Sequence, residues 1–449
     1  MRLTPWIVLA IAATPAAAEP QKLTLDQLTA KAIAGPRTTL AQEDTDAARA
    51  RVDEADAARL PKATGTGFLT ISPEIHCVDV PCTQTAPAGF ALQFSGAFGG
   101  LGITITQPLY TFGKIATAQD AAHAGVRAQA ALEDEAAGDA AVDAARAYYG
   151  LKLARELRFM LEEGIDEIVK AKEHLDERVT DGSGEVTIQD QQRVATLLAE
   201  AKIQLEDAKD GEAQALAGVH ALVGSDDVDI DDAPLAAVTT PLSDPAKYEN
   251  AASDRPQVVA AREGALAAHS LADFETRQYY PDFAVLGTAT WADAQGVDRP
   301  PSWIYSQPYH VAGVGLALVL RWNLDPWTTH SHVLRAEAQA RHADTLAELA
   351  RTGATLEIRN AYSEASRAKA KVDAATDGEK AAHTWVASVL QNDAIGTADP
   401  KDLADAYIAW FQMRARLMQA IFQWDVATVR LRRATGEFRA DAARPKETR

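Results

Sequence analysis

The sequence predicts a mainly α-helical protein with a minor β part, and three observations support that fold class. Residues 113–181 and 327–396 are proline-free stretches of 69 and 70 residues that are compatible with uninterrupted helix. At 1.5 Å per residue each would extend about 100 Å, far beyond the usual globular helix. Four shorter segments alternate like β-strands, and the order of helices and strands is the same in both halves of the chain.

The composition favours thin helical packing and argues against a nucleic-acid partner. Among 449 residues, 44 are Lys or Arg and 63 are Asp or Glu, so the formal charge is −19. Phosphate recognition needs clustered cations, which an acidic surface does not provide. Aromatic residues supply only 6% of the chain, while alanine is frequent. No apolar run reaches the roughly 18 residues of a membrane-spanning helix.

The first 18 residues are typical of a secretory signal peptide. Arg2 precedes an apolar stretch, and small residues stand at Ala16 and Ala18. Cleavage after Ala18 leaves 43 basic against 63 acidic residues, a charge of −20 for the mature chain. A short N-terminal core helix is the alternative interpretation.

The two cysteines, Cys77 and Cys82, are separated by four residues. In an exported protein such a close pair is expected to form a small disulfide within a loop. A metal site is the alternative, but it would need ligands beyond the adjacent His76.

The internal repeat divides the mature chain into residues 19–224 and 251–438. Each half contains a moderate helix, a strand, a polar loop, a second strand, a very long helix, a glycine break and a closing helix. Residues 225–250 combine clustered aspartates with three prolines, which predicts a solvated acidic linker. Calcium binding is an alternative, although the stretch lacks the residue order of a known calcium loop. Residues 439–449 are a polar C-terminal tail.

Proline marks equivalent positions in the two halves, because it ends a helix and favours an extended residue before it. The first half has a helix over residues 24–60, Pro61 and a strand over residues 65–75. The corresponding parts of the second half are residues 255–280, Pro281 and residues 283–291.

The second strand of each half has one apolar face. In residues 101–109, Leu101, Ile103 and Ile105 fall on one side and small or polar residues on the other. Residues 310–322 are longer, and their apolar side contains Val314, Leu316, Leu318, Leu320 and Trp322.

Strands of about ten residues with an apolar outer face are long enough to cross an outer membrane as part of a barrel. Four strands cannot close a barrel, which needs about eight, so the chain is expected to contribute its strands to a symmetric oligomer. A small soluble sheet packed against helices is the alternative. Aromatic residues near the strand ends, as expected at bilayer interfaces, are Tyr279, Tyr280, Trp291, Trp303, Tyr305, Tyr309, Trp322 and Trp327.

The closing helix of the second half has a heptad pattern that is typical of coiled-coil packing. Its large and small residues form two stripes with a period of seven, which we interpret as packing seams and not as a cofactor site. The large stripe is Leu403, Trp410, Leu417, Trp424 and Leu431, and the small one is Ala406, Met413, Ala420, Ala427 and Ala434.

Catalytic signatures are absent from the sequence. There is no phosphate-binding loop, no G-x-S-x-G elbow and no HExxH motif. His330 and His332 lack a cysteine or carboxylate at ligand spacing, so we interpret them as surface residues. We expect no enzyme activity, no cofactor and no metal site.

This sequence resembles the TolC family of bacterial outer-membrane efflux proteins over essentially the whole mature chain, and four segments carry the resemblance. QPLYTFGK at 107–114 is similar to the family's strand-to-helix junction, and residues 255–283 to the opening of its second repeat. GEVTIQDQQRV at 184–194 and GTADPKDLADA at 396–406 are similar to its two helix-turn tips. The resemblance implies a homotrimer with a 12-stranded β-barrel in the outer membrane. A coiled-coil α-helical barrel then crosses the periplasm and meets an adaptor protein and an inner-membrane transporter.

The resemblance also implies a gate of acidic side chains at the periplasmic entrance. Asp402 and Asp405 fall on the family's acidic positions, and Asp190 on the corresponding position of the first repeat. In a trimer each would form a ring of three carboxylates that attracts cations. The alternative is that these aspartates complement the helix dipole in a first turn.

The chain departs from the family where a Tyr and an Arg connect the closed tip. Asp393 and Ala398 occupy those two positions, which puts the usual latch in doubt. Lys401 and Arg193 are the nearby cations that would have to replace it.

The leading hypothesis is a passive outer-membrane exit duct of a tripartite efflux or type I secretion system. A periplasmic coiled-coil adaptor or scaffold without a membrane barrel is the alternative from another class, and an enzyme with a helical cap is a third. The sequence names no exported substrate, because a wide passage needs no recognition pocket and selection is expected to belong to the transporter.

Overall fold

The computed structural model describes residues 20–76, 94–180, 187–299, 309–394 and 400–440. The predicted signal peptide and the predicted disulfide of Cys77 and Cys82 lie outside these ranges. The chain separates into two compact units, each assembled from both repeats. One comprises Met1–Glu43, Ala130–Val259 and Glu348–Arg449, here called the helical unit, and the other comprises Asp44–Gln129 and Ala260–Ala347, here called the sheet unit.

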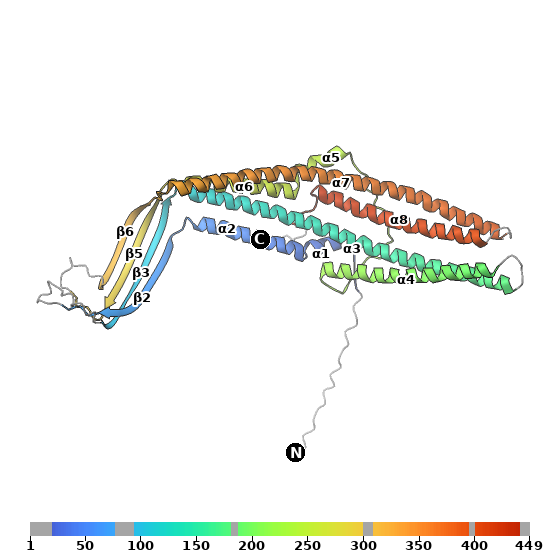
Figure 1. Ribbon diagram of the computed structural model, residues 1–449, viewed down its shortest axis with the longest axis horizontal. Helices are drawn as coiled ribbons and strands as arrows, with labels where there is room; N and C mark the ends of the chain where they lie inside the picture. Colours follow the sequence, from blue (N-terminus) through green and yellow to red (C-terminus); the bar gives the residue numbers. More distant parts are fainter. Residues whose placement is uncertain (1–19, 77–93, 181–186, 300–308, 395–399, 441–449) are drawn as a thin grey trace, which may run out of the picture. The chain divides into compact units, whose positions relative to one another are not determined.

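The sheet unit contains a four-stranded antiparallel sheet in which neighbouring strands follow the chain order β2-β3-β5-β6 (Figure 1). All four predicted strands are present, and the second begins earlier than expected. Within the described part of the chain, neither outer strand of this sheet has a second partner. The strands are β2 (Lys62–Pro73), β3 (Phe94–Tyr110), β5 (Asp282–Ala294) and β6 (Val311–Arg321).

One face of the sheet is apolar and exposed, as the alternation predicted. Leu101 of β3 lies between Gly67 and Trp291, and its side chain is 66% exposed. On β6, Val314 and Leu316 are 89% and 82% exposed. On this face, large apolar side chains lie next to glycine and alanine of the neighbouring strands. They therefore make the surface hydrophobic.

The opposite face of the sheet is lined by threonine and glycine. Thr64, Thr104 and Thr288 form one row across three strands, in register. In the next row, Thr66 pairs with Gly102 and Gly102 with Thr290. Alternation along the strands therefore separates a strongly apolar side from a more polar one, although Phe68, Phe98 and Leu286 fall on the threonine and glycine side.

The turn from β3 into α3 (Lys114–Thr180) depends on two residues with positive φ, Phe112 at 51° and Gly113 at 83°. Arg277 of α6 (Pro256–Arg277) donates from Nη1 to the Phe112 carbonyl at 3.0 Å. A Cβ on Gly113 would lie 2.6 Å from that same Nη1. Glycine is therefore required at this position both by its backbone conformation and by the arginine beside it.

The helical unit contains two antiparallel helix pairs. The C-terminal part of α3 lies beside α4 (Ile188–Val223), and the C-terminal part of α7 (Pro326–Ala394) lies beside α8 (Pro400–Ala434) (Figure 1). The two very long helices are 67 and 69 residues long, close to the predicted lengths. Within the described residues no helix is long and apolar enough to cross a membrane.

The heptad stripes of α8 are packing seams, as predicted. Buried Trp424 and Leu431, with Ala420 and Ala427, pack against α7. The helices approach so closely that a Cβ on Gly378 of α7 would lie 2.2 Å from the Met413 methyl group. On α7 the same cluster contains Ala365, Ala368, Val372 and Ala375.

The prediction of one helix over residues 24–60 is wrong. The segment forms α1 (Leu25–Ile33) and α2 (Pro36–Ala57), which are separated at Ala34 and Gly35. Proline has no N–H to continue the first helix and favours a position at the start of the second. Thr24 begins α1 with a capping box that includes Gln27.

The segment predicted to be a solvated linker is partly buried. Its strand β4 (Val228–Ile230) pairs in parallel with β1 (Gln21–Leu23), and Ile230 is fully buried. Asp229 accepts from Arg155 at 2.7 Å and Asp231 from Lys152 at 2.7 Å. These two aspartates are therefore paired with bases of α3.

Further along, the linker is fixed to α8. The Trp424 Nε1 donates to the Val238 carbonyl at 2.9 Å, and the Val238 N–H donates to Asp425 Oδ1 at 2.8 Å. Asp425 is fully buried, and its Oδ2 has no hydrogen-bond partner within the described residues. Burial raises the pKa of Asp425 to about 7, although the Val238 N–H acts in the opposite direction.

We expect Asp425→Asn to stabilise the protein increasingly as the pH rises from 4 to 8. A carboxyl whose pKa is raised on folding contributes fully only below its unfolded pKa, and this contribution is lost as the pH rises through the folded value. The amide keeps the acceptor for Val238 and cannot ionise. We expect a gain of about 1–4 kcal/mol at pH 8 from chemical denaturation of the detergent-solubilised protein. Exposed Asp373→Asn is the control, and a gain independent of pH would contradict the assignment.

Candidate functional site

The predicted gate lies where each antiparallel pair of the helical unit turns. In the first pair α3 ends at Thr180 and α4 begins at Ile188; in the second α7 ends at Ala394 and α8 begins at Pro400. The residues of both turns, Ala398 among them, lie outside the described ranges, and so does the side chain of Asp393. The three candidate aspartates are all in the first two turns of the returning helices.

The side chain of Asp190 takes part in the N-terminal cap of α4. Its Oδ2 accepts from the Thr187 N–H at 3.0 Å and from the Thr187 hydroxyl at 2.6 Å, while the Asp190 N–H donates to that hydroxyl at 3.4 Å. This capping box satisfies two of the N–H groups that have no partner within the helix. The Thr187 hydroxyl, followed by the Thr187 N–H, lowers the pKa of Asp190. The cap accounts for an aspartate here without a gate.

Unlike Asp190, Asp402 and Asp405 form no capping hydrogen bond with any residue that the structure describes. Both side chains are exposed, and neither has a hydrogen bond or ion pair to any other described residue. They are three residues apart on α8, so they lie on the same side of the helix. No contact joins them to Asp190 within the described part of a single chain. A carboxylate pair without cation partners is suited to attract cations from solution.

The cations considered as substitutes for the latch are close to the same helix starts. Arg193 Nη1 lies 3.9 Å from Asp190 Oδ1, one turn along α4. This contact is within a helix, so it does not connect the two helix pairs. A latch through Arg193 or Lys401 stays a prediction.

An aromatic cluster of Tyr407, Trp410 and Phe411 follows Asp405 on α8, and we did not predict it as a unit. Tyr407 stacks on Phe411 with 6.2 Å between ring centroids, and Trp410 is 5.2 Å from Phe411. The Trp410 Nε1 donates to Glu379 of α7 at 2.9 Å. A Cβ on Gly164 of α3 would lie 2.9 Å from the Phe411 ring. The signal was present in the spacing of Tyr407 and Phe411, because side chains four residues apart meet on one helix face.

A groove of about 370 Å³ lies beside this cluster, and Tyr407 and Phe411 form part of its wall. Its walls are mainly aliphatic and come from α3, α4, α7 and α8, with Glu167 and Lys170 as its charged groups. The sequence did not reveal the groove, because its walls come from four separate helices. Its aliphatic lining is Ile168, Ala171, Leu175, Val194, Leu197, Leu390, Leu403, Ala404 and Ile408.

The part of the chain that the structure describes contains no cluster of potential metal ligands. No group of three or more His, Cys, Asp or Glu side chains has an arrangement that could hold an ion. The aspartates of residues 226–232 include Asp229 and Asp231, which are paired with bases.

We expect Thr187→Ala to loosen the first turn of α4. The substitution removes the hydroxyl that exchanges hydrogen bonds with Asp190, and loss of such a cap costs about 1 kcal/mol. Hydrogen–deuterium exchange should quicken about fivefold at the amides of residues 188–191 and stay unchanged in the middle of α4. Thr196→Ala is the matched control, because its hydroxyl bonds only to the Gln192 carbonyl of its own helix. Equal exchange in both variants would show that the cap is not what orders this turn.

Comparison with known proteins finds one family model that matches part of the chain. Residues 248–437 match the model of the outer membrane efflux protein family. No curated protein matches the chain in sequence.

Solved structures match nearly the whole chain. The outer-membrane channel OprN is 19% identical, with a TM-score of 0.74 over 96% of this chain and 98% of its own. The CmeC outer membrane channel of Campylobacter jejuni is 16% identical, with a TM-score of 0.74 over 93% of this chain and 86% of its own. The MtrE outer membrane channel of Neisseria gonorrhoeae, in its open state, is 15% identical, with a TM-score of 0.72 over 97% of this chain and 98% of its own.

These matches agree with the architecture of long helices and four strands. They confirm the resemblance to efflux proteins that the helix tips and strand-to-helix junctions suggested. The second half of the chain therefore matches the outer membrane efflux protein family in sequence, and the chain as a whole shares the fold of solved outer-membrane channels.

Proposed function

We propose that the protein is the passive exit duct of a tripartite efflux system, which assembles as a homotrimer. The observation that carries this proposal is the sheet of β2, β3, β5 and β6. It exposes an apolar face and has an unpartnered strand at each edge within the described residues. Open strand edges cannot remain in hydrocarbon, where water does not satisfy backbone groups. Closure with other copies removes both edges at once.

Three copies would supply 12 strands, enough for a closed barrel with an aqueous interior. The threonine and glycine face would line that interior, and the leucine and valine face would contact lipid. The aromatic residues Trp291 and Trp322, both more than half exposed, suit the bilayer interfaces.

The groove beside the aromatic cluster of α8 supports a helical partner. An amphipathic helix docks by placing apolar side chains in a groove lined by several helices. We propose a periplasmic adaptor as this partner, with an inner-membrane transporter supplying the energy. MtrE is described in an open state, and we propose that the helix turns of this chain open in a comparable way. If the exported substrate is a polypeptide, the same duct would belong to a type I secretion system.

Within this duct, Asp402 is the best candidate for an acidic gate. It is exposed, it has no partner among the described residues, and it stands beside a helix turn. Asp405 shares its helix face and would form a second ring. Asp190 is the weakest of the three, because its carboxylate already accepts two hydrogen bonds in the cap.

We expect the purified mature protein to form heat-modifiable trimers in outer-membrane fractions and to conduct ions in planar bilayers. A periplasmic coiled-coil adaptor or scaffold would instead be a soluble monomer. Gel migration before and after heating, with cross-linking, separates the two outcomes. The apolar face provides a matched test: Leu316→Asp should reduce membrane insertion, while Gly313→Ser on the opposite face, where a Cβ meets no atom within 4 Å, should not. A chain that remains monomeric and never inserts would disprove the duct.

We expect Asp402→Asn to reduce block of the channel current by multivalent cations, with no loss of trimer. Removal of three carboxylates from a narrow constriction weakens the local field for cations. Single-channel recordings with Mg²⁺ or a trivalent cation at the periplasmic side should show at least about a tenfold higher blocking concentration. Asp207→Asn, an exposed aspartate in the middle of α4, is the control. Identical block of the parent and Asp402→Asn channels would remove Asp402 from the gate.

A further inference from the structure

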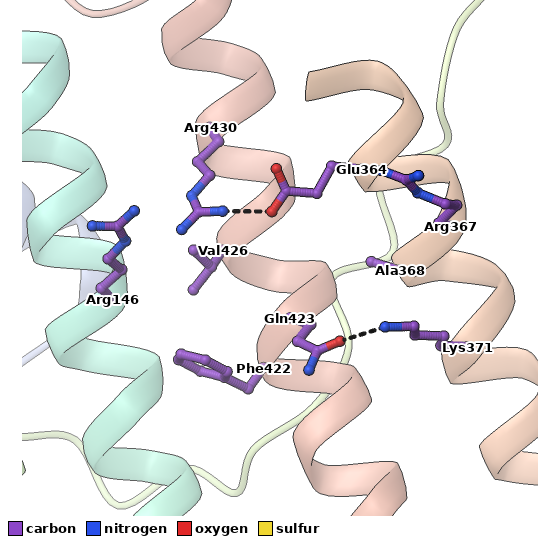
Figure 2. A pocket seen from close by; sticks show the side chains of 9 residues that line it. All are labelled: Arg146, Glu364, Arg367, Ala368, Lys371, Phe422, Gln423, Val426 and Arg430. Atoms are coloured by element: carbon purple, nitrogen blue, oxygen red, sulfur yellow. Dashed lines mark hydrogen bonds and ion pairs between the residues drawn. The ribbon is translucent and has the colours of Figure 1, made fainter. Parts of the chain in front are cut away.

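A second groove in the helical unit has the opposite charge to the chain as a whole. It has a volume of about 550 Å³ and is bounded by α3, α8 and α7 (Figure 2). Four cationic side chains and a single carboxylate border it, in a protein with a formal charge of −19. The cations are Arg146, Arg367, Lys371 and Arg430, and the carboxylate is Glu364.

Glu364 neutralises only one of the four cations. Its Oε1 accepts from Arg430 Nη1 at 2.5 Å (Figure 2). Lys371 Nζ donates to the neutral Gln423 Oε1 at 3.1 Å, so its charge has no counterion there. Arg146 has Asp143 of its own helix at 3.9 Å, the outer limit of an ion pair. Arg367 forms no ion pair with any other described residue. The groove therefore has an excess of positive charge.

Arg433 of α8 shows, by contrast, how acids pair with an arginine in the interior of this unit. Arg433, one turn from Arg430, contacts Asp139 at 2.8 Å and Glu135 at 3.3 Å and also pairs with Glu357. The chain thus has ample acid to neutralise its cations where pairing stabilises the fold. At the groove it does not do so.

The excess charge is concentrated on one side of α7. Arg367 and Lys371 are four residues apart, a spacing at which like charges on a helix repel by about 0.2–0.5 kcal/mol. A neighbouring groove of about 340 Å³ contains Lys371 again and adds Arg416 of α8. A bound anion would relieve this repulsion. Guanidinium groups suit that task, because their planar donors match carboxylate, sulfonate and phosphate oxygens.

The same groove has an apolar part. Phe422 and Val426 of α8 lie on the side toward Arg146, and Ala368 of α7 lies on the other side (Figure 2). An inorganic anion would use the cations alone. A ligand with an apolar body beside its charged group would use both parts.

We propose that this groove binds organic anions, with the oxyanion between Arg367, Lys371 and Arg430 and the apolar body against Phe422 and Val426. The site belongs to one chain and is separate from the helix turns and the sheet. It goes beyond the proposed duct, because it gives the wall of the helical unit a preference for one class of solute. Its test needs no conduction, so a failure of the duct and a failure of this site are distinguishable.

Calorimetric titration of the detergent-solubilised full chain with naphthalene-1-sulfonate tests the site. We expect binding that is at least about tenfold tighter than that of the uncharged naphthalene-1-sulfonamide, and that weakens as NaCl is added. Inorganic phosphate is the second probe, and we expect it to bind more weakly because it has no apolar body. Equal affinity for sulfonate and sulfonamide would overturn the proposal, and so would phosphate binding as tightly as the sulfonate.

Paired variants locate the binding. Arg367→Gln combined with Lys371→Gln should weaken sulfonate binding about tenfold or more. The control combines Lys369→Gln with Lys380→Gln, which removes the same charge from α7 outside the groove and should leave binding unchanged. Glu364→Gln should tighten binding about threefold, because it frees Arg430. This gain cannot result from misfolding. Loss of affinity in Glu364→Gln, or equal affinity in the groove and control pairs, would contradict the site.

Discussion

The backbone N–H and C=O groups at the two edges of the four-stranded sheet need partners, and this requirement constrains how the protein can assemble. β2 and β6 each have one strand neighbour within the described residues, while the leucines and valines of the sheet face outward. A sheet with an apolar face is stable only against lipid or protein, and a sheet edge in lipid must be paired. The proposed trimer answers both requirements, and the strand pairing of the duplicated halves supplies the repeating element.

In the helical unit the corresponding constraint is close packing. Alanine on α7 and α8 allows the helices to approach until Trp424 and Leu431 fill the space between them. The acidic linker is held against this surface by Trp424 and by the buried Asp425, a carboxyl whose pKa is raised by burial to about 7. Charge is therefore used locally: paired in the linker, buried at Asp425, and left in excess at the groove of Arg367 and Lys371.

The carboxylates at the two helix starts show that equivalent positions in a repeat need not share a role. Asp190 is engaged by Thr187, whereas Asp402 has no partner in the described structure. Both readings of a first-turn aspartate, cap and gate, were available from the sequence. Only the hydrogen bonds of Thr187 distinguish them, because a capping box needs an N-cap side chain at the right backbone angle as well as an acid three residues later.

The sequence by itself determined the class of fold, the two long helices, the four strands and their apolar faces, because these follow from local periodicity and from proline. The break before Pro36, inside an otherwise helical stretch, was not predicted. The partly buried strand β4 was predicted to be solvated linker, because a cluster of acidic residues does not reveal distant partners such as Lys152 and Arg155. The apolar groove and the basic groove were decided by tertiary structure alone. Each is formed by side chains from three or four helices that are far apart in the chain, and no spacing within one helix encodes such a meeting.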